Sequence, residues 1–302
     1  MNLRTVIPLP VRQTVQAARV GWRRQRLRLS SAWRVRVLAR QNLTGTEPVT
    51  GDAAVCVSLT TYGKRLESVF ITIESIAAGA VRPARLILWL DDPMAFAAPP
   101  EELQRLASRG LEIHLTDNLG PHTKYYPYVT GEDDGVLSLV TADDDIVYPV
   151  TWLAGLMEAH HQHPEDVICY RAWVVRTEDG ALAPYDNWDP CLTKEPSVRN
   201  FATGVSGVLY PPFMIRQLAA AGTAFRDTCP AADDIWLHAA ALRAGLKVRQ
   251  VTARPQHFPL IPDTQDVGLT RSNFVGGRND TQAAATYTAA DIMLLEAQAQ
   301  RP

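Results

Sequence analysis

Residues 139–149 read LVTADDDIVYP, an apolar run that passes directly into three consecutive aspartates. The apolar part belongs to residues 135–140, which predict a buried β-strand because short apolar runs are typical of strands covered on both faces. Asp143, Asp144 and Asp145 then follow the carboxyl end of that strand. Side chains two residues apart in extended backbone point the same way, so Asp143 and Asp145 share one side while Asp144 supports the turn.

Apolar strands and amphipathic helices alternate on both sides of this stretch. The sequence predicts further strands at residues 53–59, 85–90, 111–115, 166–175 and 246–251, and helices at 65–78, 101–108, 149–157 and 233–244. This alternation predicts an α/β domain with a mostly parallel central sheet. In such sheets ligands bind outside the carboxyl ends of the strands, where the polar groups Thr60-Thr61-Tyr62, Asp91-Asp92 and Asp117-Asn118 stand.

The aspartate cluster is a candidate metal site. Two carboxylates one strand step apart suit a hard divalent cation that keeps waters and takes further ligands from phosphates. Three adjacent acids also repel one another unless a cation or a base is near. The alternative interpretation is a solvated acidic turn.

Charge is distributed unevenly along the 302 residues. Residues 1–46 carry ten of the 30 basic residues and no acid, so the remainder holds 20 basic against 32 acidic residues. A domain with this excess of acidic residues should bind nucleic acid poorly, because neutralisation of phosphates by basic residues supplies most of the affinity for nucleic acid. We therefore expect a basic, partly helical arm over residues 1–50 and a globular domain over 51–302.

The arm combines arginines with tryptophan on a narrow apolar face, which is typical of helices that lie on an anionic membrane surface. Docking on a partner enzyme or on the acidic domain, and a transit peptide, are the alternatives for residues 1–40. No run approaches the ~18 apolar residues of a transmembrane helix, and no signal peptide is recognisable. Four cysteines without paired spacing predict reduced thiols in a cytoplasmic protein. Together with the basic arm, this predicts a location peripheral at the inner face of the membrane. Only Cys191 and Cys229 are candidates for pairing in an oxidising compartment.

Five segments together resemble a bacterial glycosyltransferase of the GT-A fold, near the family 2-like group. They are VSLTTYGKR (57–65), LILWLDD (86–92), DNLGPHTKYYP (117–127), LVTADDDIVYP (139–149) and PAADDIWL (230–237). The resemblance covers about residues 53–260, and its specificity comes from a DxD motif after the fourth strand with an acidic pair downstream. It implies a Rossmann-like enzyme that transfers a hexosyl group from a nucleotide-diphosphate sugar, by default a UDP-sugar, to a glycan or lipid-linked acceptor in polysaccharide biosynthesis.

The resemblance also implies roles for individual residues. Asp145 binds Mn²⁺ or Mg²⁺ bridging the donor diphosphate, Asp143 contacts the metal or the ribose, and His257 occupies the place of a third ligand, although a lone histidine is more often structural. The other donor-binding candidates are Thr60, Tyr62 and Arg65 beside the nucleotide, Asp91 or Asp92 at the base, Lys124 near the diphosphate, Asp144 in the motif, and Gly204 and Gly207 in a loop that lets backbone approach the sugar.

Asp233 and Asp234 open the predicted helix at 233–244 beside the acceptor. The resemblance implies that Asp234 is the general base that deprotonates the acceptor hydroxyl, which inverts the anomeric centre. Asp233 replaces the usual glutamate of the family, which puts the acceptor geometry in doubt. Two alternatives stay open: a retaining enzyme without a dedicated base, and acids that only stabilise the helix dipole, worth about 0.3–1 kcal/mol.

Two other function classes compete with glycosyl transfer. One is a different metal-dependent phosphate enzyme, a nucleotidyltransferase or phosphohydrolase. The other is a non-catalytic scaffold recruited through the basic arm. The position of the acids after the fourth strand and the downstream pair Asp233-Asp234 favour the glycosyltransferase over another phosphate enzyme. A scaffold would show no metal-dependent turnover.

Overall fold

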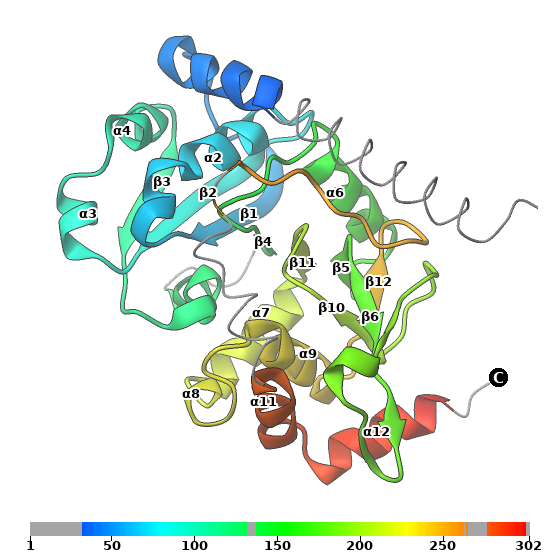
Figure 1. Cartoon of the computed structure of the whole chain (residues 1–302). Coiled ribbons are helices and arrows are strands. Elements are labelled where there is room, and N and C mark those ends of the chain that lie inside the picture. The colour runs from blue at the N-terminus through cyan, green and yellow to red at the C-terminus, as the bar shows by residue number, and fades with distance from the viewer. Residues whose placement is uncertain (1–31, 132–136, 263, 265–276, 300–302) are drawn as a thin grey trace, which may run out of the picture.

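A seven-stranded sheet forms the centre of the computed structural model, which describes residues 32–131, 137–262, 264 and 277–299 (Figure 1). In spatial order its strands are β12 (Val248–Gln250), β5 (Val167–Cys169), β11 (Val208–Tyr210), β4 (Ser138–Thr141), β1 (Ala53–Thr60), β2 (Pro83–Leu90) and β3 (Leu111–Leu115). Strand β1 is parallel to β2 and β4, β2 is parallel to β3, and β12 is parallel to β5. Only β11 runs antiparallel to its two neighbours. The predicted α/β class with a mostly parallel central sheet is confirmed.

Both faces of the sheet are apolar because successive side chains of a strand point to opposite faces. In β1, Val55, Val57 and Leu59 belong to one core and Cys56 to the other, and all four are fully buried. The first core is covered by α2 (Val69–Ala77), α4 (Glu101–Ala107) and α6 (Trp152–Gln162); the second is covered by α5 (Tyr126–Val129), α7 (Pro212–Ala221) and α9 (Asp233–Arg243). Burial on both sides explains why these strands are almost continuously apolar.

Several segments differ from the sequence prediction. The helix expected at 65–78 divides at Ser68 into a 3-10 helix over Gly63–Glu67 and α2, and the helix expected from 149 begins at Trp152. The strand expected at 166–175 is two short strands, β5 and β6 (Ala172–Val174). A second, antiparallel sheet joins β6 to β9 (Asp189–Pro190) and β10 (Asn200–Ala202). Strand β11 was not predicted, because a strand of three residues is too short to show a recognisable hydrophobic periodicity. The fourth strand begins at Ser138, and part of its expected range, 132–136, lies outside the described residues.

Short elements and the C-terminal helices complete the fold. They are η1 (Gly63–Glu67), α3 (Pro93–Ala97), η2 (Gly120–Lys124), β7 (Thr177–Glu178), β8 (Ala181–Leu182), η3 (Tyr185–Asn187), α8 (Phe225–Thr228), α11 (Arg278–Thr286) and α12 (Ala289–Ala299). Figure 1 shows α11 beside α9, on the side of the molecule where α12 also lies.

The end of the predicted arm is helical over residues 32–44. Leu38 is buried there in a small apolar cluster with Ile71, Val147 and Ile261. Residues 1–31, which carry most of the predicted arm, lie outside the described residues, and the division at residue 50 stays a prediction. Within the described ranges no helix is long and apolar enough to cross a membrane. All four cysteines are buried as free thiols.

Candidate active site

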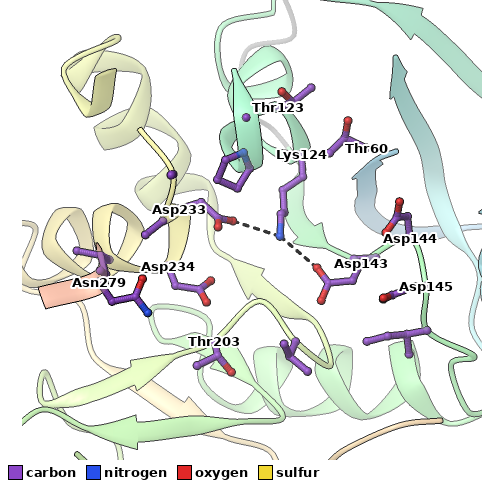
Figure 2. Close-up of a pocket in the computed structure, with 18 of the residues that line it drawn as sticks. Thr60, Thr123, Lys124, Asp143, Asp144, Asp145, Thr203, Asp233, Asp234 and Asn279 are labelled. Atoms are coloured by element: carbon purple, nitrogen blue, oxygen red, sulfur yellow. Dashed lines mark hydrogen bonds and ion pairs between the residues drawn. The ribbon is translucent and has the colours of Figure 1, made fainter. Parts of the chain in front are cut away.

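The carboxyl ends of the central strands open into one cavity of about 750 Å³ (Figure 2). It brings together ten of the residues singled out in the sequence: Thr60, Tyr62, Arg65, Asp91, Lys124, Asp143, Asp144, Asp145, Asp233 and Asp234. They come from segments up to 174 residues apart, between Thr60 and Asp234. The parallel sheet brings them together because its strands end along the same edge.

Arg65 holds the aspartate turn. Its Nη1 lies 2.7 Å from Asp144 Oδ1, and its Nη2 lies 3.1 Å from Asp145 Oδ2. Thr61 Oγ1 donates to the other Asp144 oxygen at 2.7 Å. Thr72 Oγ1 of α2 lies at hydrogen-bond distance from two backbone carbonyls of the turn, 3.0 Å from Asp144 O and 2.9 Å from Ile146 O. Asp144 is thus engaged within the protein, as expected for a residue that supports the turn.

The acids of this turn are hard to ionise together. Burial raises the pKa of Asp144 above its usual value, while Arg65 and Thr61 lower it in part. Burial, followed by the neighbouring charge of Asp143, raises the pKa of Asp145 to about 6, and Arg65 offsets only part of this. A cation bound beside the turn would favour the ionised forms of Asp144 and Asp145, so the site is suited to bind further positive charge.

Lys124 joins the two acidic pairs. Its Nζ lies 3.1 Å from Asp143 Oδ1 and 3.2 Å from Asp233 Oδ2 (Figure 2). Asp143 accepts a hydrogen bond from it, whereas Asp233 Oδ2 has no hydrogen-bond geometry to any described residue, so that second contact is electrostatic. Burial disfavours the charged lysine, but Asp143, Asp233 and Asp234 together raise its pKa well above the usual value. Lys124 is therefore a fixed positive charge.

Asp234 is held by a backbone amide. The N–H of Gly204 donates to Asp234 Oδ1 at 2.8 Å. A Cβ at position 204 would lie 3.2 Å from that oxygen and 3.2 Å from Lys124 Nζ, closer than ordinary contact, so a larger residue would displace one of these two side-chain ends. Burial and then the charge of Asp233 raise the pKa of Asp234, and Lys124 offsets part of the rise. A carboxylate with a raised pKa and a fixed orientation is suited to accept a proton.

Three predicted site residues lie elsewhere. Asp92 caps α3, where its side chain accepts from Met94 N and Ala95 N. Gly207 has φ +93°, and a Cβ there would meet the Trp152 ring at 2.7 Å, so this glycine serves packing and the turn. His257 is exposed in the segment after β12 and does not line the cavity.

The three predicted metal ligands are not brought together. Among the residues that the structure describes, no group of three or more histidine, cysteine, aspartate or glutamate side chains is placed to hold a metal ion. Asp143 and Asp145 share the cavity, but His257 stays outside it. The sequence predicted His257 just after the last strand, but β12 ends at Gln250, and the direction of the segment between them depends on tertiary packing.

The cavity has a second end that sequence reasoning missed. It is lined by Arg171 and Trp173 around β6, Tyr185 and Trp188 around η3, and Asn279 of α11. None of these residues belongs to a recognisable motif. Arg171 and Trp173 fall in the segment expected to be one central strand, which concealed the turn that directs them to the cavity.

Comparisons with known proteins give matches among solved structures. No family model matches the chain, and no curated protein matches its sequence. S. aureus TarS in complex with UDP-GlcNAc is similar with a TM-score of 0.46 and 14% identity, over 73% of this chain and 61% of the TarS chain. A mannosyltransferase from Pyrobaculum calidifontis in complex with GDP-Man and Mn²⁺ is similar with a TM-score of 0.49 and 15% identity, over 90% of this chain and 79% of that chain. The chain thus spans about three-fifths of the TarS structure.

Proposed function

We propose that this chain is a metal-dependent glycosyltransferase of the GT-A fold, related to the family 2-like group. It would move a hexosyl group from a nucleotide-diphosphate sugar, with UDP as the default nucleotide, to a hydroxyl group of a glycan or lipid-linked acceptor. One observation supports this above all: a single cavity holds two acidic pairs, Asp143/Asp145 and Asp233/Asp234, with Lys124 in ion-pair contact with a member of each. A transferase needs one group for the diphosphate and another for the acceptor proton.

The carboxylates of the aspartate turn fit Mn²⁺ or Mg²⁺, but with two protein ligands and not the predicted three. Asp143 and Asp145 line the cavity, and the Asp143 side chain is 22% exposed. Two carboxylates suit a hard cation that retains waters and shares the phosphates of its substrate. His257 would have to move from its exposed position to join them. The metal, when bound, would neutralise negative charge that develops on the departing nucleoside diphosphate.

The protein's own groups supply the rest of the proposed chemistry. Thr60, Tyr62 and Asp91 line the end of the cavity that we assign to the nucleoside. Lys124 would face the diphosphate, where a preorganised charge stabilises the transition state more than the ground state. Asp234 would take the proton of the acceptor hydroxyl, and the attack of that oxygen on the anomeric carbon would invert its configuration.

We further propose that residues 1–50 form a basic arm on the transferase domain 51–302 and place it at an anionic membrane surface. On the described helix 32–44, Trp33 is 68% exposed and stands among exposed arginines, while Leu38 faces the domain. Tryptophan and arginine on one outward face suit the headgroup region of a bilayer. Such a location would fit a lipid-linked acceptor in polysaccharide assembly.

A donor hydrolysis assay tests the main proposal. The purified protein is incubated with UDP-, GDP-, TDP- and CMP-sugars, with Mn²⁺ or with EDTA, and release of the nucleotide is measured. We expect slow release of the nucleotide from one donor with Mn²⁺ only, and loss of this release in Asp145→Ala.

Equal release in EDTA would contradict the metal assignment. Release of pyrophosphate or of free phosphate instead would favour a nucleotidyltransferase or a phosphohydrolase. No turnover with any donor, together with intact binding of partner proteins by Asp145→Ala, would favour a scaffold.

A further inference from the structure

The second end of the cavity has an aromatic wall. Trp173 is partly exposed to the cavity, and the rings of Tyr185 and Trp188 lie with centroids 4.8 Å apart at 43°. Figure 2 shows Asn279 near Asp234, with Thr60 on the far side of Lys124, so this end lies beyond Asp234 as seen from the nucleoside end. Flat aromatic surface beside polar groups suits a ligand with both apolar and polar faces.

Among the basic residues that the structure describes in the cavity lining, Arg171 is the one without a carboxylate partner. Its guanidinium carbon lies 5.3 Å from the Trp173 ring centre, and Nη1 reaches Thr203 Oγ1 at a long 3.4 Å. Within the described part of the chain it has no carboxylate at ion-pair distance, whereas Arg65 and Lys124 each have two. A planar guanidinium in this state is suited to bind a carboxylate or phosphate in bidentate fashion.

Asn279 presents an unsatisfied acceptor. Its Oδ1 is buried and has no hydrogen-bond partner among the residues that the structure describes. Leaving such an atom unpaired is costly, so a ligand that brings a hydroxyl donor gains from filling it. Because Asn279 lines the same cavity as Asp234, that hydroxyl group would lie near the proposed base.

We propose that this end of the cavity is an acceptor subsite for a sugar residue that carries a carboxylate or phosphate group. The sugar ring stacks on Trp173, one of its hydroxyl groups donates to Asn279 Oδ1, and its anionic group pairs with Arg171. This inference rests on the proposed glycosyl transfer and narrows its acceptor to acidic carbohydrates.

Most acids of the cavity contact groups other than Arg171, although the charges of Asp234 and Asp143 act on it at longer range. Asp143, Asp144, Asp145 and Asp233 already contact Arg65 or Lys124, and Asp234 accepts from the Gly204 amide. Two further acids near the aromatic wall, Asp186 and Asp280, are exposed, so water and salt screen them.

The test compares matched acidic and neutral sugars. Calorimetric titrations of the wild-type chain, with and without UDP and Mn²⁺, would use methyl β-glucuronide against methyl β-glucoside, and glucose 6-phosphate against glucose. We expect the acidic member of at least one pair to bind about tenfold more tightly, as is typical of a hydrogen-bonded charge pair. The pair that shows the preference distinguishes carboxylate from phosphate. Trp173→Ala should weaken the acidic and neutral members alike.

Variants then assign the preference to Arg171. Arg171→Gln should abolish it while changing UDP affinity less than twofold, and Arg176→Gln, an exposed arginine outside the cavity lining, should retain it. Equal binding of acidic and neutral sugars, or binding of neither pair, overturns the proposal. A loss of UDP affinity in Arg171→Gln also overturns it, because the arginine would then serve the donor. The hydrolysis assay above tests the transferase proposal without any acceptor, so the two can fail separately.

Discussion

Arg65 and Lys124 determine how much negative charge the cavity presents. Each base contacts two aspartates, and these contacts account for Asp143, Asp144, Asp145 and Asp233. Asp234 accepts a hydrogen bond from the Gly204 amide; burial raises its pKa most, the charge of Asp233 raises it further, and Lys124 lowers it in part. The consequences of this arrangement are measurable at single residues.

Asp233→Asn should move the acidic limb of the pH–rate profile to lower pH. The charge of Asp233 raises the pKa of Asp234, so removing that charge lowers it. A carboxylate base acts in its ionised form, and activity therefore rises as the pH increases through its pKa. The measurement is kcat/KM for sugar transfer between pH 4 and 9. An acidic limb that stays in place in Asp233→Asn would show that Asp234 does not govern it.

Asp234→Asn should abolish transfer and spare donor binding. Loss of a general base typically reduces the rate about 10²–10⁴-fold. Binding of UDP, measured by calorimetry, should change little because Asp234 lies away from the Thr60 end of the cavity. Normal transfer by this variant would rule out Asp234 as the base.

Gly204→Ala should reduce transfer while the protein stays folded. The added methyl group would lie 3.2 Å from both Asp234 Oδ1 and Lys124 Nζ, so it would displace one of these groups. The matched control is Gly131→Ala, whose Cβ would meet its nearest atoms at an ordinary 3.4 Å. Circular dichroism melting checks the fold of both. Equal activity of the two variants would contradict a positioning role for the glycine.

At the scale of secondary-structure elements, a buried ion pair ties α2 to the segment after α4. Glu74 of α2 is fully buried against Arg109, and Asn42 Nδ2 donates to the same carboxylate at 3.1 Å. The helix that starts the described chain is thereby fixed to the helices over the sheet. None of these three residues lines the cavity, although Thr72 of the same helix contacts the aspartate turn, so we expect their loss to act on stability more than on substrate contacts.

Glu74→Gln should destabilise the protein by about 3–5 kcal/mol, because it leaves the Arg109 charge buried without its partner. Glu101→Gln, in the exposed pair with Arg105, should cost less than about 1 kcal/mol. Urea unfolding followed by fluorescence measures both free energies. Similar losses of unfolding free energy in the two variants would show that the buried ion pair stabilises the protein no more than the exposed one.

At the scale of the whole molecule, the arm and the cavity give separate predictions. Wild-type protein should sediment with vesicles that contain anionic lipid, and less so at high salt, because salt screens the attraction of its arginines. Trp33→Ser should weaken this binding, whereas Met293→Ser, which removes a similarly exposed apolar side chain on α12, should not. Equal sedimentation with neutral vesicles would contradict the electrostatic part of the proposal.

The apolar strands, the α/β class and the acids at the strand ends followed from the sequence, because each depends on neighbouring residues. Burial on both faces makes a strand apolar by itself, and Asp143–Asp145 follow such a strand directly. The acidic pair at 233–234 was likewise visible as the start of a helix. Patterns among neighbouring residues therefore predicted the carboxyl edge of the sheet and the acidic residues that lie along it.

Tertiary structure alone decided which groups meet in the cavity. The pairing of Arg65 with Asp144, the Gly204 amide on Asp234 and the insertion of β11 between β4 and β5 all join segments distant in sequence. Arg171 and Trp173 reach the cavity only because the expected strand breaks between β5 and β6. Contacts of this kind leave no periodic signal, since their energy comes from packing between elements and not from the preferences of either segment.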